Sequence, residues 1–343
     1  MIVKPHGGEL IDRVLSLKER EAILSFRDKF FNLEIDEEKA IEVQNIATGV
    51  FSPLKGFMNQ EDYREVVQNS RLASGHAWTL PIVLPVSRET AKKFAKNDTI
   101  ILTTGEQVIA SMQVEDIYAW DFAEYAQNVF GTTDEKHPGI KMLKSSGELF
   151  VGGSINFLSE PITRFPAYYL TPRETRVLFK EKKWDTVVGF QTRNVSHLGH
   201  EYVQKSAQSI VDGLFINPVI GKKKPGDFTD EVILDSYKAL IDEYYARERT
   251  AMSILQFEMR YAGPKEAIFH AIVRKNFGCS HFIIGRDHAG VGSYYHPFAA
   301  QKIFDSFPDL GITPMFFMSF FFCKKCNSIA NDKTCPHPQG DHI

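Results

Sequence analysis

The pattern of apolar and polar positions changes near residue 165, and the two parts of the chain predict different architectures. Before that point, short apolar runs alternate with Gly, Asn and charged residues, a pattern typical of β-strands. The predicted strands are Thr79–Val86, Asp98–Thr104 and Gln107–Val114, with helical patches near Leu15–Phe26 and Gln60–Gln68. We therefore expect residues 1–165 to form a mixed, mostly β domain.

From about residue 180, short β-rich runs alternate with longer segments of helical periodicity. The predicted strands are Asp185–Phe190, Leu214–Ile220, Met252–Phe257, His281–Gly285 and Thr313–Phe321. The predicted helices are His197–Val211, Thr229–Arg247, Pro264–Asn276 and Pro297–Asp305. Repeated βα units with continuously apolar strands indicate an α/β fold, a doubly wound parallel sheet with helices on both faces. Ligands of such sheets bind at the carboxyl ends of the strands, where functional residues are expected.

Composition narrows the class of protein. Hydrophobic residues make up 43% of the 343 residues and charged residues 24%, which is ordinary for a packed chain. The net charge of −3 argues against nucleic-acid binding, which needs a basic excess. The N-terminus lacks the apolar core of a signal peptide, and the longest apolar run, Pro314–Cys323, is too short to cross a bilayer. We expect a cytoplasmic protein that binds neither membranes nor nucleic acids.

The strand predicted at residues 185–190 runs into a turn and a helix start that are rich in polar side chains. These are Gln191, Thr192, Arg193, Asn194, His197 and His200. The two histidines are three residues apart in the first helical turn, so their imidazoles share a face beside the free N–H groups of the helix N-terminus. Arg193 adds a planar group that matches a tetrahedral oxyanion. Each residue alone is more often a surface group, but together they predict an anion or polyphosphate site.

A zinc hydrolase is disfavoured at the first cluster, because the order H-L-G-H-E at residues 197–201 fits neither H-E-x-x-H nor H-x-x-E-H.

A second polar cluster, Gly285–Tyr295, follows the strand predicted at residues 281–284. Its glycines allow close backbone approach to a ligand, while Arg286, Asp287 and His288 present a cation, a carboxylate and an imidazole. The alternative is a Gly-rich connector in which Arg286 and Asp287 form a structural pair. Because parallel strands bring their loops together, we expect both arginines to share one pocket for two anionic reactants.

The last residues carry a metal-ligand pattern. Cys323 and Cys326 form C-x₂-C, and Cys335 supplies a third thiolate. Either His337 or His342 would complete a tetrahedral zinc site. A site closed by four protein ligands is structural, because no coordination position remains for substrate. Free cysteines in a reducing compartment are the alternative reading of this pattern.

Several segments resemble one family. QTRNVSHLGHE (Gln191–Glu201) is similar to the Q-T-R-N-P-x-H-x-x-H-E signature of ATP sulfurylases, also called sulfate adenylyltransferases, with Val195 in place of the usual Pro. Met259–Gly292 matches the second long signature of that family almost throughout. Phe51–Met58 and Ile216–Asp227 also look like family segments. The resemblance is to the bacterial and archaeal type, some members of which carry a similar zinc knuckle.

The family resemblance implies a fold and a reaction. It implies a barrel-like, PUA-like N-terminal domain (residues 1–165), a Rossmann-like nucleotidyltransferase domain (residues 166–322), and a zinc knuckle at residues 323–343 that begins a truncated C-terminal domain. The implied reaction is sulfate + ATP ⇌ adenylyl sulfate (APS) + pyrophosphate, with Mg²⁺ on the polyphosphate and structural Zn²⁺ in the knuckle. Sulfate is fully ionised at pH 7, so catalysis must come from positioning and charge neutralisation during a direct in-line attack on the α-phosphorus. We also expect a homo-oligomer.

Residue roles follow from the matching motifs. Gln191 and Arg193 would hold sulfate, together with Arg286 and the backbone of Ala289. Thr192 and Asn194 would act on the α- and β-phosphates, and His197 and His200 would stabilise the departing pyrophosphate. The expected nucleotide contacts are Gln191, Asn194, His197, His200, Gly285, Arg286, Asp287, His288 and Met318. The string TCPH favours His337 as the fourth zinc ligand.

Two other functions fit part of the pattern. Another adenylyltransferase of the same class, which transfers AMP to an organic phosphate, shares a helix-borne H-x-G-H but leaves the Arg286 cluster without a purpose. The second alternative is a noncatalytic sensor of a nucleotide or an anion, in which the knuckle binds a partner protein. Formation of ATP from APS and pyrophosphate would separate these alternatives from a sulfurylase.

Overall fold

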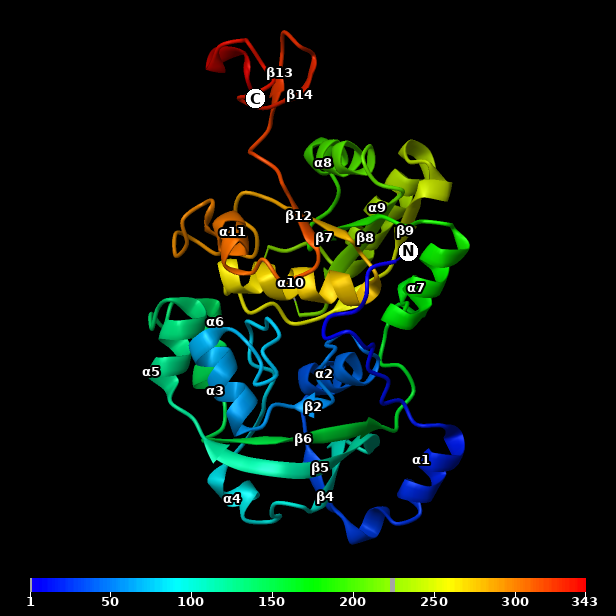
Figure 1. Ribbon diagram of the computed structural model, residues 1–343, viewed down its shortest axis with the longest axis vertical. Helices are drawn as coiled ribbons and strands as arrows, with labels where there is room; N and C mark the ends of the chain where they lie inside the picture. Colours follow the sequence, from blue (N-terminus) through cyan, green and yellow to red (C-terminus); the bar gives the residue numbers. More distant parts are fainter. Residues whose placement is uncertain (1, 223–225) are drawn as a thin grey trace.

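The computed structural model describes residues 2–222 and 226–343 and consists of two α/β bodies, one above the other, with a small C-terminal hairpin beyond them (Figure 1). The strands of the N-terminal body are β1 (Phe31–Glu34), β2 (Gly56–Phe57), β3 (Leu84–Val86), β4 (Thr99–Thr104), β5 (Gln107–Ala119) and β6 (Leu149–Phe157). Its helices are α1 (Leu17–Leu24), α2 (Glu37–Ala47), α3 (Gln60–Asn69), α4 (Arg88–Ala91), α5 (Phe122–Tyr125) and α6 (Pro138–Lys144).

The N-terminal strands form a mixed sheet in the order β1-β4-β5-β6-β2, with β3 also paired to β6. Strands β4 and β5 confirm the strands predicted there, and α1 and α3 confirm the helical patches. The strand predicted at Thr79–Val86 is wrong over most of its length, because only Leu84–Val86 pairs in the sheet. Pro81 lacks the backbone N–H that a continuous ladder needs, and residues 79–83 are buried as irregular chain.

The second body contains the predicted parallel sheet. Its strands are β7 (Val187–Thr192), β8 (Gly213–Ile220), β9 (Thr250–Met252), β10 (Leu255–Gln256), β11 (His281–Ile284) and β12 (Thr313–Phe316). Its helices are α7 (Pro172–Glu181), α8 (Leu198–Gln208), α9 (Asp230–Tyr244), α10 (Pro264–Phe277) and α11 (Ala299–Lys302). The order is β10-β8-β7-β11-β12, with β9 beside β8, and the recorded pairs are parallel.

Alternate strand residues pack on opposite faces of this sheet. Val188, Leu214 and Ile216 belong to a core with residues of α8 and α9. Val187, Phe215 and Phe282 belong to another core with residues of α7 and α10. This two-residue alternation explains why the strands read as continuous apolar runs: both faces are covered by helices.

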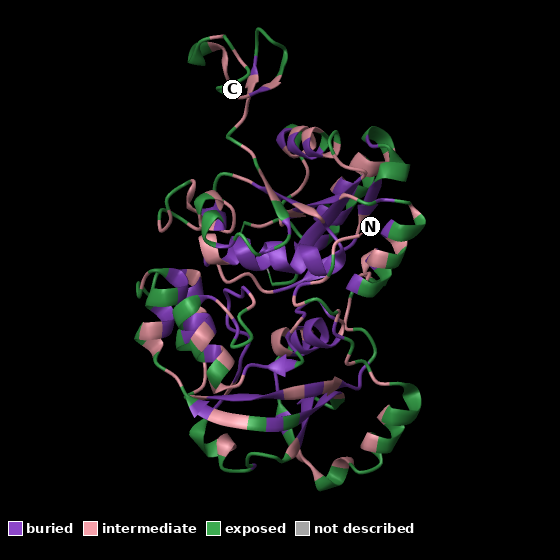
Figure 2. Cartoon of the chain, in the orientation of Figure 1, coloured by how far each residue is buried: buried purple, intermediate pink, exposed green. Residues whose placement is uncertain are grey.

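Helix α10 joins the two bodies. Every residue from Glu266 to Phe277 is buried, and Figure 2 shows this helix as an unbroken buried segment at the junction. Asn276 Nδ2 donates hydrogen bonds to the carbonyls of Val50 and Ser52, each at 2.9 Å. One apolar core therefore runs from the N-terminal sheet through α10 to the parallel sheet.

The chain after β12 leaves the sheet earlier than predicted. The strand expected to reach Phe321 ends at Phe316, and residues 321–330 form an antiparallel hairpin of β13 (Phe321–Cys323) and β14 (Ser328–Ala330). Figure 1 shows this hairpin at the end of the molecule, above α8. No helix in the described part of the chain combines the length and apolar character needed to span a bilayer.

Candidate active site

The first polar cluster lies at the carboxyl end of β7, as predicted. The strand extends two residues further than expected, so Gln191 and Thr192 are its last residues, and Arg193 and Asn194 begin the turn. His197 is the N-cap of α8 and not a residue of its first turn, because the helix begins at Leu198. Its Nδ1 accepts a hydrogen bond from the Gly199 N–H at 3.1 Å. This bond leaves the ring proton on Nε2 of the neutral imidazole, which can donate to an anion.

The two histidines of this cluster are stacked. The ring centroids of His197 and His200 are 3.8 Å apart. Burial lowers the pKa of His200 to about 4, and the neighbouring His197 contributes in the same direction. Burial also lowers the pKa of His197. Both rings are therefore neutral at pH 7, so neither presents a positive charge to a ligand.

Gly199 lies between the two histidines for a steric reason. A Cβ at this position would lie 1.9 Å from a ring carbon of Phe320. Phe320 belongs to the segment that connects β12 to the hairpin, and its ring also approaches Tyr202 of α8. The glycine therefore allows the C-terminal segment to pack directly on the start of α8.

Arg193 is held in place by two partners. Its guanidinium donates hydrogen bonds to the Tyr261 hydroxyl and to the Asp227 carboxylate. The side chain of Arg193 is 19% exposed and that of Asp227 is 8% exposed, so the ion pair is largely removed from water. Burial lowers the pKa of Arg193, but Tyr261 and Asp227 outweigh it and raise the pKa above its ordinary value. Arg193 is therefore a permanent cation at the carboxyl edge of the sheet.

The second cluster lies beside the first because β11 pairs with β7 in parallel. Two adjoining cavities lie at this edge. One, of about 430 Å³, is lined by Arg286, Gly285, His197 and Met318 among others. The other, of about 330 Å³, is lined by Thr192, Arg193, Asn194, Asp287 and Ala289 among others. Gln191, His200 and His288 line both cavities.

The expectation that Arg193 and Arg286 share a single pocket needs correction. Each arginine lines its own cavity, and the two cavities meet at Gln191, His200 and His288. The reason is the partner set of Arg193: Asp227 and Tyr261 turn its guanidinium toward the chain that follows β8 and β10. Because both clusters lie at the carboxyl ends of neighbouring strands, Arg193 and Arg286 still lie on either side of the three polar residues that line both cavities.

The remaining predicted residues lie in the same region. Gly285 and Arg286 follow β11 directly, and Arg286 and Asp287 are exposed. Ala289 has a φ of 58°, in the left-handed region, and its carbonyl accepts a hydrogen bond from Gly263 N at 3.1 Å. Met318 was predicted on the last strand, but it follows the end of β12 and is 39% exposed. It lines the cavity of Arg286 and not that of Arg193.

Several residues of the site carry no assignment from the sequence. Asp227 and Tyr261 contact Arg193, and His270 of α10 contacts both Gln191 and His288. Asp227 and Tyr261 lie in segments that resemble the family, and this resemblance could have identified them. Their contact with Arg193 could not be predicted, because it joins loops that follow different strands. Residues 223–225 of the segment Ile216–Asp227 lie outside the described residues.

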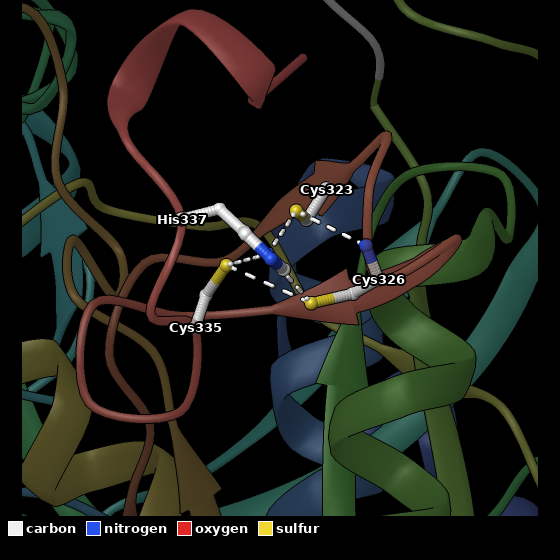
Figure 3. A group of neighbouring side chains, drawn as sticks. All are labelled: Cys323, Cys326, Cys335 and His337. Atoms are coloured by element: carbon white, nitrogen blue, oxygen red, sulfur yellow. Dashed lines mark hydrogen bonds between the residues drawn. The ribbon is translucent and has the colours of Figure 1, made fainter.

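The predicted knuckle brings its ligands together. Cys323, Cys326, Cys335 and His337 offer donor atoms that all lie within 4.8 Å of one another. Figure 3 shows the three sulfurs around Nδ1 of His337, at 3.3 to 3.7 Å from it. His342 lies outside this group and stacks on Phe321, with ring centroids 3.6 Å apart, although its Nε2 is 3.6 Å from Cys335 Sγ. Three thiols and one imidazole form a donor set suited to a tetrahedral metal ion.

Comparison with known proteins decides the family. A family model described as ATP-sulfurylase matches residues 166–343, and a PUA-like domain model matches residues 3–160. The chain belongs to the ATP-sulfurylase family. A sulfate adenylyltransferase of Pyrococcus abyssi is 53% identical over 343 residues, which is 100% of this chain and 90% of the relative. A relative of the same name from Halothermothrix orenii is 46% identical over 347 residues, covering 100% of this chain and 91% of its own.

The ATP-sulfurylase fold also recurs among solved structures. A hexameric APS kinase from Thiobacillus denitrificans superposes with a TM-score of 0.75 at 21% sequence identity. The match covers 99% of this chain, which spans 61% of the length of that protein. The likeness shows that the fold recurs, and the two family models confirm the predicted order of a PUA-like domain followed by the ATP-sulfurylase domain.

Proposed function

We propose that this chain catalyses the reaction sulfate + ATP ⇌ APS + pyrophosphate. The observation that carries this proposal is the meeting of two arginine-bearing cavities at Gln191, His200 and His288, in a chain of the ATP-sulfurylase family. A sulfate oxygen attacks the α-phosphorus of ATP in line, the new S–O–P bond forms, and the bond from the α-phosphorus to the bridging oxygen of pyrophosphate breaks. The electron pair leaves with pyrophosphate, and no proton is transferred.

The two arginines would bring like-charged reactants together. Sulfate would bind at Arg193 with Gln191, and Arg286 and the Ala289 backbone would complete its neutralisation. The carboxylate of Asp227 presently contacts Arg193, so sulfate must share or displace that contact. A guanidinium has five N–H donors, which permits it to hold a carboxylate and an oxyanion together.

The stacked histidines would act on the phosphates. His197 has its ring proton on Nε2, because Nδ1 is occupied by the Gly199 N–H, and it can donate to the departing pyrophosphate. His200 would stabilise the departing pyrophosphate beside it, and Thr192 and Asn194 would act on the α- and β-phosphates. The nucleotide would contact Gly285, Asp287, His288 and Met318. Neutral donors of this kind stabilise a developing charge without the cost of reorganising water.

The metals have separate tasks in this proposal. Mg²⁺ would neutralise the polyphosphate, held by phosphate oxygens of ATP. Zn²⁺ would be held by Cys323, Cys326, Cys335 and His337, whose donor atoms fit a closed tetrahedral site. We further propose the domain division at residues 165 and 322 and a homo-oligomeric state. The cytoplasmic location stays a prediction.

A direct assay tests the proposed reaction. Purified protein given APS and pyrophosphate with Mg²⁺ is expected to form ATP, and ATP with sulfate is expected to release pyrophosphate only when sulfate is present. Replacement of sulfate by an organic phosphate is the matched control for the other adenylyltransferase class. Absence of ATP formation, while ATP still binds, would favour the noncatalytic sensor.

A further inference from the structure

The segment Arg260–Gly263 lies between β10 and α10 and contacts two groups of the proposed sulfate site. The Tyr261 hydroxyl accepts a hydrogen bond from the Arg193 guanidinium, whose carbon lies 5.3 Å from the centroid of the Tyr261 ring. Two residues further on, the Gly263 N–H donates a hydrogen bond to the Ala289 carbonyl at 3.1 Å. The conformation of this one segment therefore bears on both the Arg193 side chain and the Ala289 backbone.

Tyr261 has an unusual backbone conformation within this segment. Its φ is 60°, in the left-handed region that is unfavourable for a residue with a Cβ. Such a conformation persists only where surrounding contacts impose it, and it is most frequent at functional sites. The groups that hold the backbone of Tyr261 are therefore the groups that direct its side chain.

Glu266 holds the segment from the side of α10. It is the third residue of that helix and is fully buried. Its Oε1 accepts a hydrogen bond from the Arg260 N–H, and its Oε2 accepts one from the Ala262 N–H, both at 2.9 Å. The carboxyl group thus binds the backbone on both sides of Tyr261.

His137 holds the segment from the N-terminal body. It is the buried N-cap of α6, and its Nδ1 accepts a hydrogen bond from the Gly139 N–H at 3.1 Å. Burial lowers the pKa of His137, so the ring is neutral at pH 7 and carries its proton on Nε2. That Nε2 lies 3.1 Å from the Tyr261 carbonyl and 3.2 Å from the Tyr295 hydroxyl. Tyr295 donates its own proton to the Phe130 carbonyl, so both neighbours of Nε2 can accept its proton.

We propose that His137 and Glu266 are positioning residues for sulfate, because they hold Tyr261 in the conformation that directs its hydroxyl to Arg193. This inference rests on the proposed function for the identity of the oxyanion. It gives the N-terminal body a part in the reaction, through the contact of α6 with the segment before α10. The residues proposed to bind the reactants themselves all lie in the second body.

A substitution at His137 breaks the contact while keeping the helix cap. His137→Asn leaves a good N-cap residue for α6, but its side chain is too short to reach the Tyr261 carbonyl. A crystal structure of this variant is expected to show the Tyr261 hydroxyl displaced from the Arg193 guanidinium. An unchanged contact between Tyr261 and Arg193 overturns the inference. This readout needs neither turnover nor sulfate, so it is separate from failure of the proposed reaction.

The Michaelis constants of the two substrates distinguish positioning from general damage. His137→Asn and Tyr261→Phe are each expected to raise the KM for sulfate about 3- to 10-fold, the range of one hydrogen bond, and to leave the KM for ATP within about twofold. His76→Asn is the matched control in the same body, where His76 Nδ1 contacts Ser74 Oγ at 2.9 Å, and it should leave both constants unchanged. An equal rise of both constants in His137→Asn overturns the inference.

A double variant shows whether His137 acts through Tyr261. Since the effect of His137 passes through the Tyr261 hydroxyl, the variant with both His137→Asn and Tyr261→Phe is expected to raise the KM for sulfate no further than the larger single effect. Multiplication of the two single effects overturns the inference.

Glu266→Gln tests the other support of the segment. It replaces one acceptor oxygen by an N–H donor that faces a backbone N–H, so the KM for sulfate should rise at least as much as in His137→Asn. A folded Glu266→Gln variant with a normal KM for sulfate overturns the role of Glu266. If this variant does not fold, the variants of His137 and Tyr261 decide the inference.

Discussion

Arg193 is the side chain on which the proposed chemistry depends most. Arg193→Ala is expected to lower kcat/KM for ATP formation from APS by at least about 100-fold, because the cation that neutralises sulfate is lost. The far-UV circular dichroism should not change. Arg164→Ala is the matched control, since Arg164 forms an exposed ion pair with Glu231 away from the cavities. Near-normal activity of Arg193→Ala would refute the assignment.

His197 combines a structural and a chemical role, and one substitution separates them. Asn is a good N-cap residue, so His197→Asn should preserve the start of α8 and change the unfolding free energy by less than about 0.5 kcal/mol. It removes the Nε2–H donor, and kcat is expected to fall about 10- to 100-fold. Measured together, urea unfolding and the initial rate distinguish the two roles. A normal rate in a normally stable variant would show that the imidazole takes no part.

Helix α8 and the C-terminal segment fit together at Gly199. Gly199→Ala would push a methyl group into the Phe320 ring, and overpacking of this kind costs about 1–3 kcal/mol. The affinity for ATP should fall as well, because Phe320 lines the cavity of Arg286. The double variant with Phe320→Leu is expected to recover part of the stability. If the second substitution adds to the loss, the contact is not the cause.

The hairpin of β13 and β14 and the chain after it bring together the four proposed zinc ligands. Purified protein is expected to contain one zinc ion per chain, as measured by mass spectrometry of the metal content. His337→Ala should lose that zinc, whereas His342→Ala should keep it, because only His337 lies among the three thiols. Zinc loss in His342→Ala alone would reverse the choice of ligand.

The observed ends of helices and strands show which boundaries the local sequence pattern predicts correctly. Helix α10 was predicted to start at Pro264 and does, and Gly278 ends it with a φ of 105°. The helix expected from Pro297 begins only at Ala299 and is short. Strand β12 ends early because the apolar residues after Phe316 pack on α8 and line a cavity, and apolar character alone does not reveal that difference.

Acid stability is a property of the whole molecule. Burial lowers the pKa of both His6 and His200 to about 4. Between about pH 6.5 and 4, the unfolded chain binds protons that the folded chain does not, so the free energy of unfolding decreases as the pH falls through this window. The loss between pH 7 and 5 is expected to be about 2 kcal/mol per histidine.

Urea unfolding at the two pH values measures this loss. His6→Gln removes one titrating group far from the cavities, and its stability should depend less steeply on pH than that of the wild type. His6 lies in the N-terminal segment and its Nε2 contacts the Ala77 carbonyl at 2.7 Å, which a Gln amide can also contact. A wild-type protein that becomes more stable on acidification would contradict the assignment.

The alternation of short apolar runs with helical segments was sufficient to predict the parallel sheet. The spacing of motifs was sufficient to predict the knuckle and the polar residues at the strand ends. Those features are local, since each depends on residues within about one βα unit. The separation of the two arginine cavities, the Asp227 partner of Arg193 and the contacts of His270 with Gln191 and His288 were decided only by the tertiary structure. Each joins side chains from different strand ends or helices, and the packing of α10 against both bodies sets their distances.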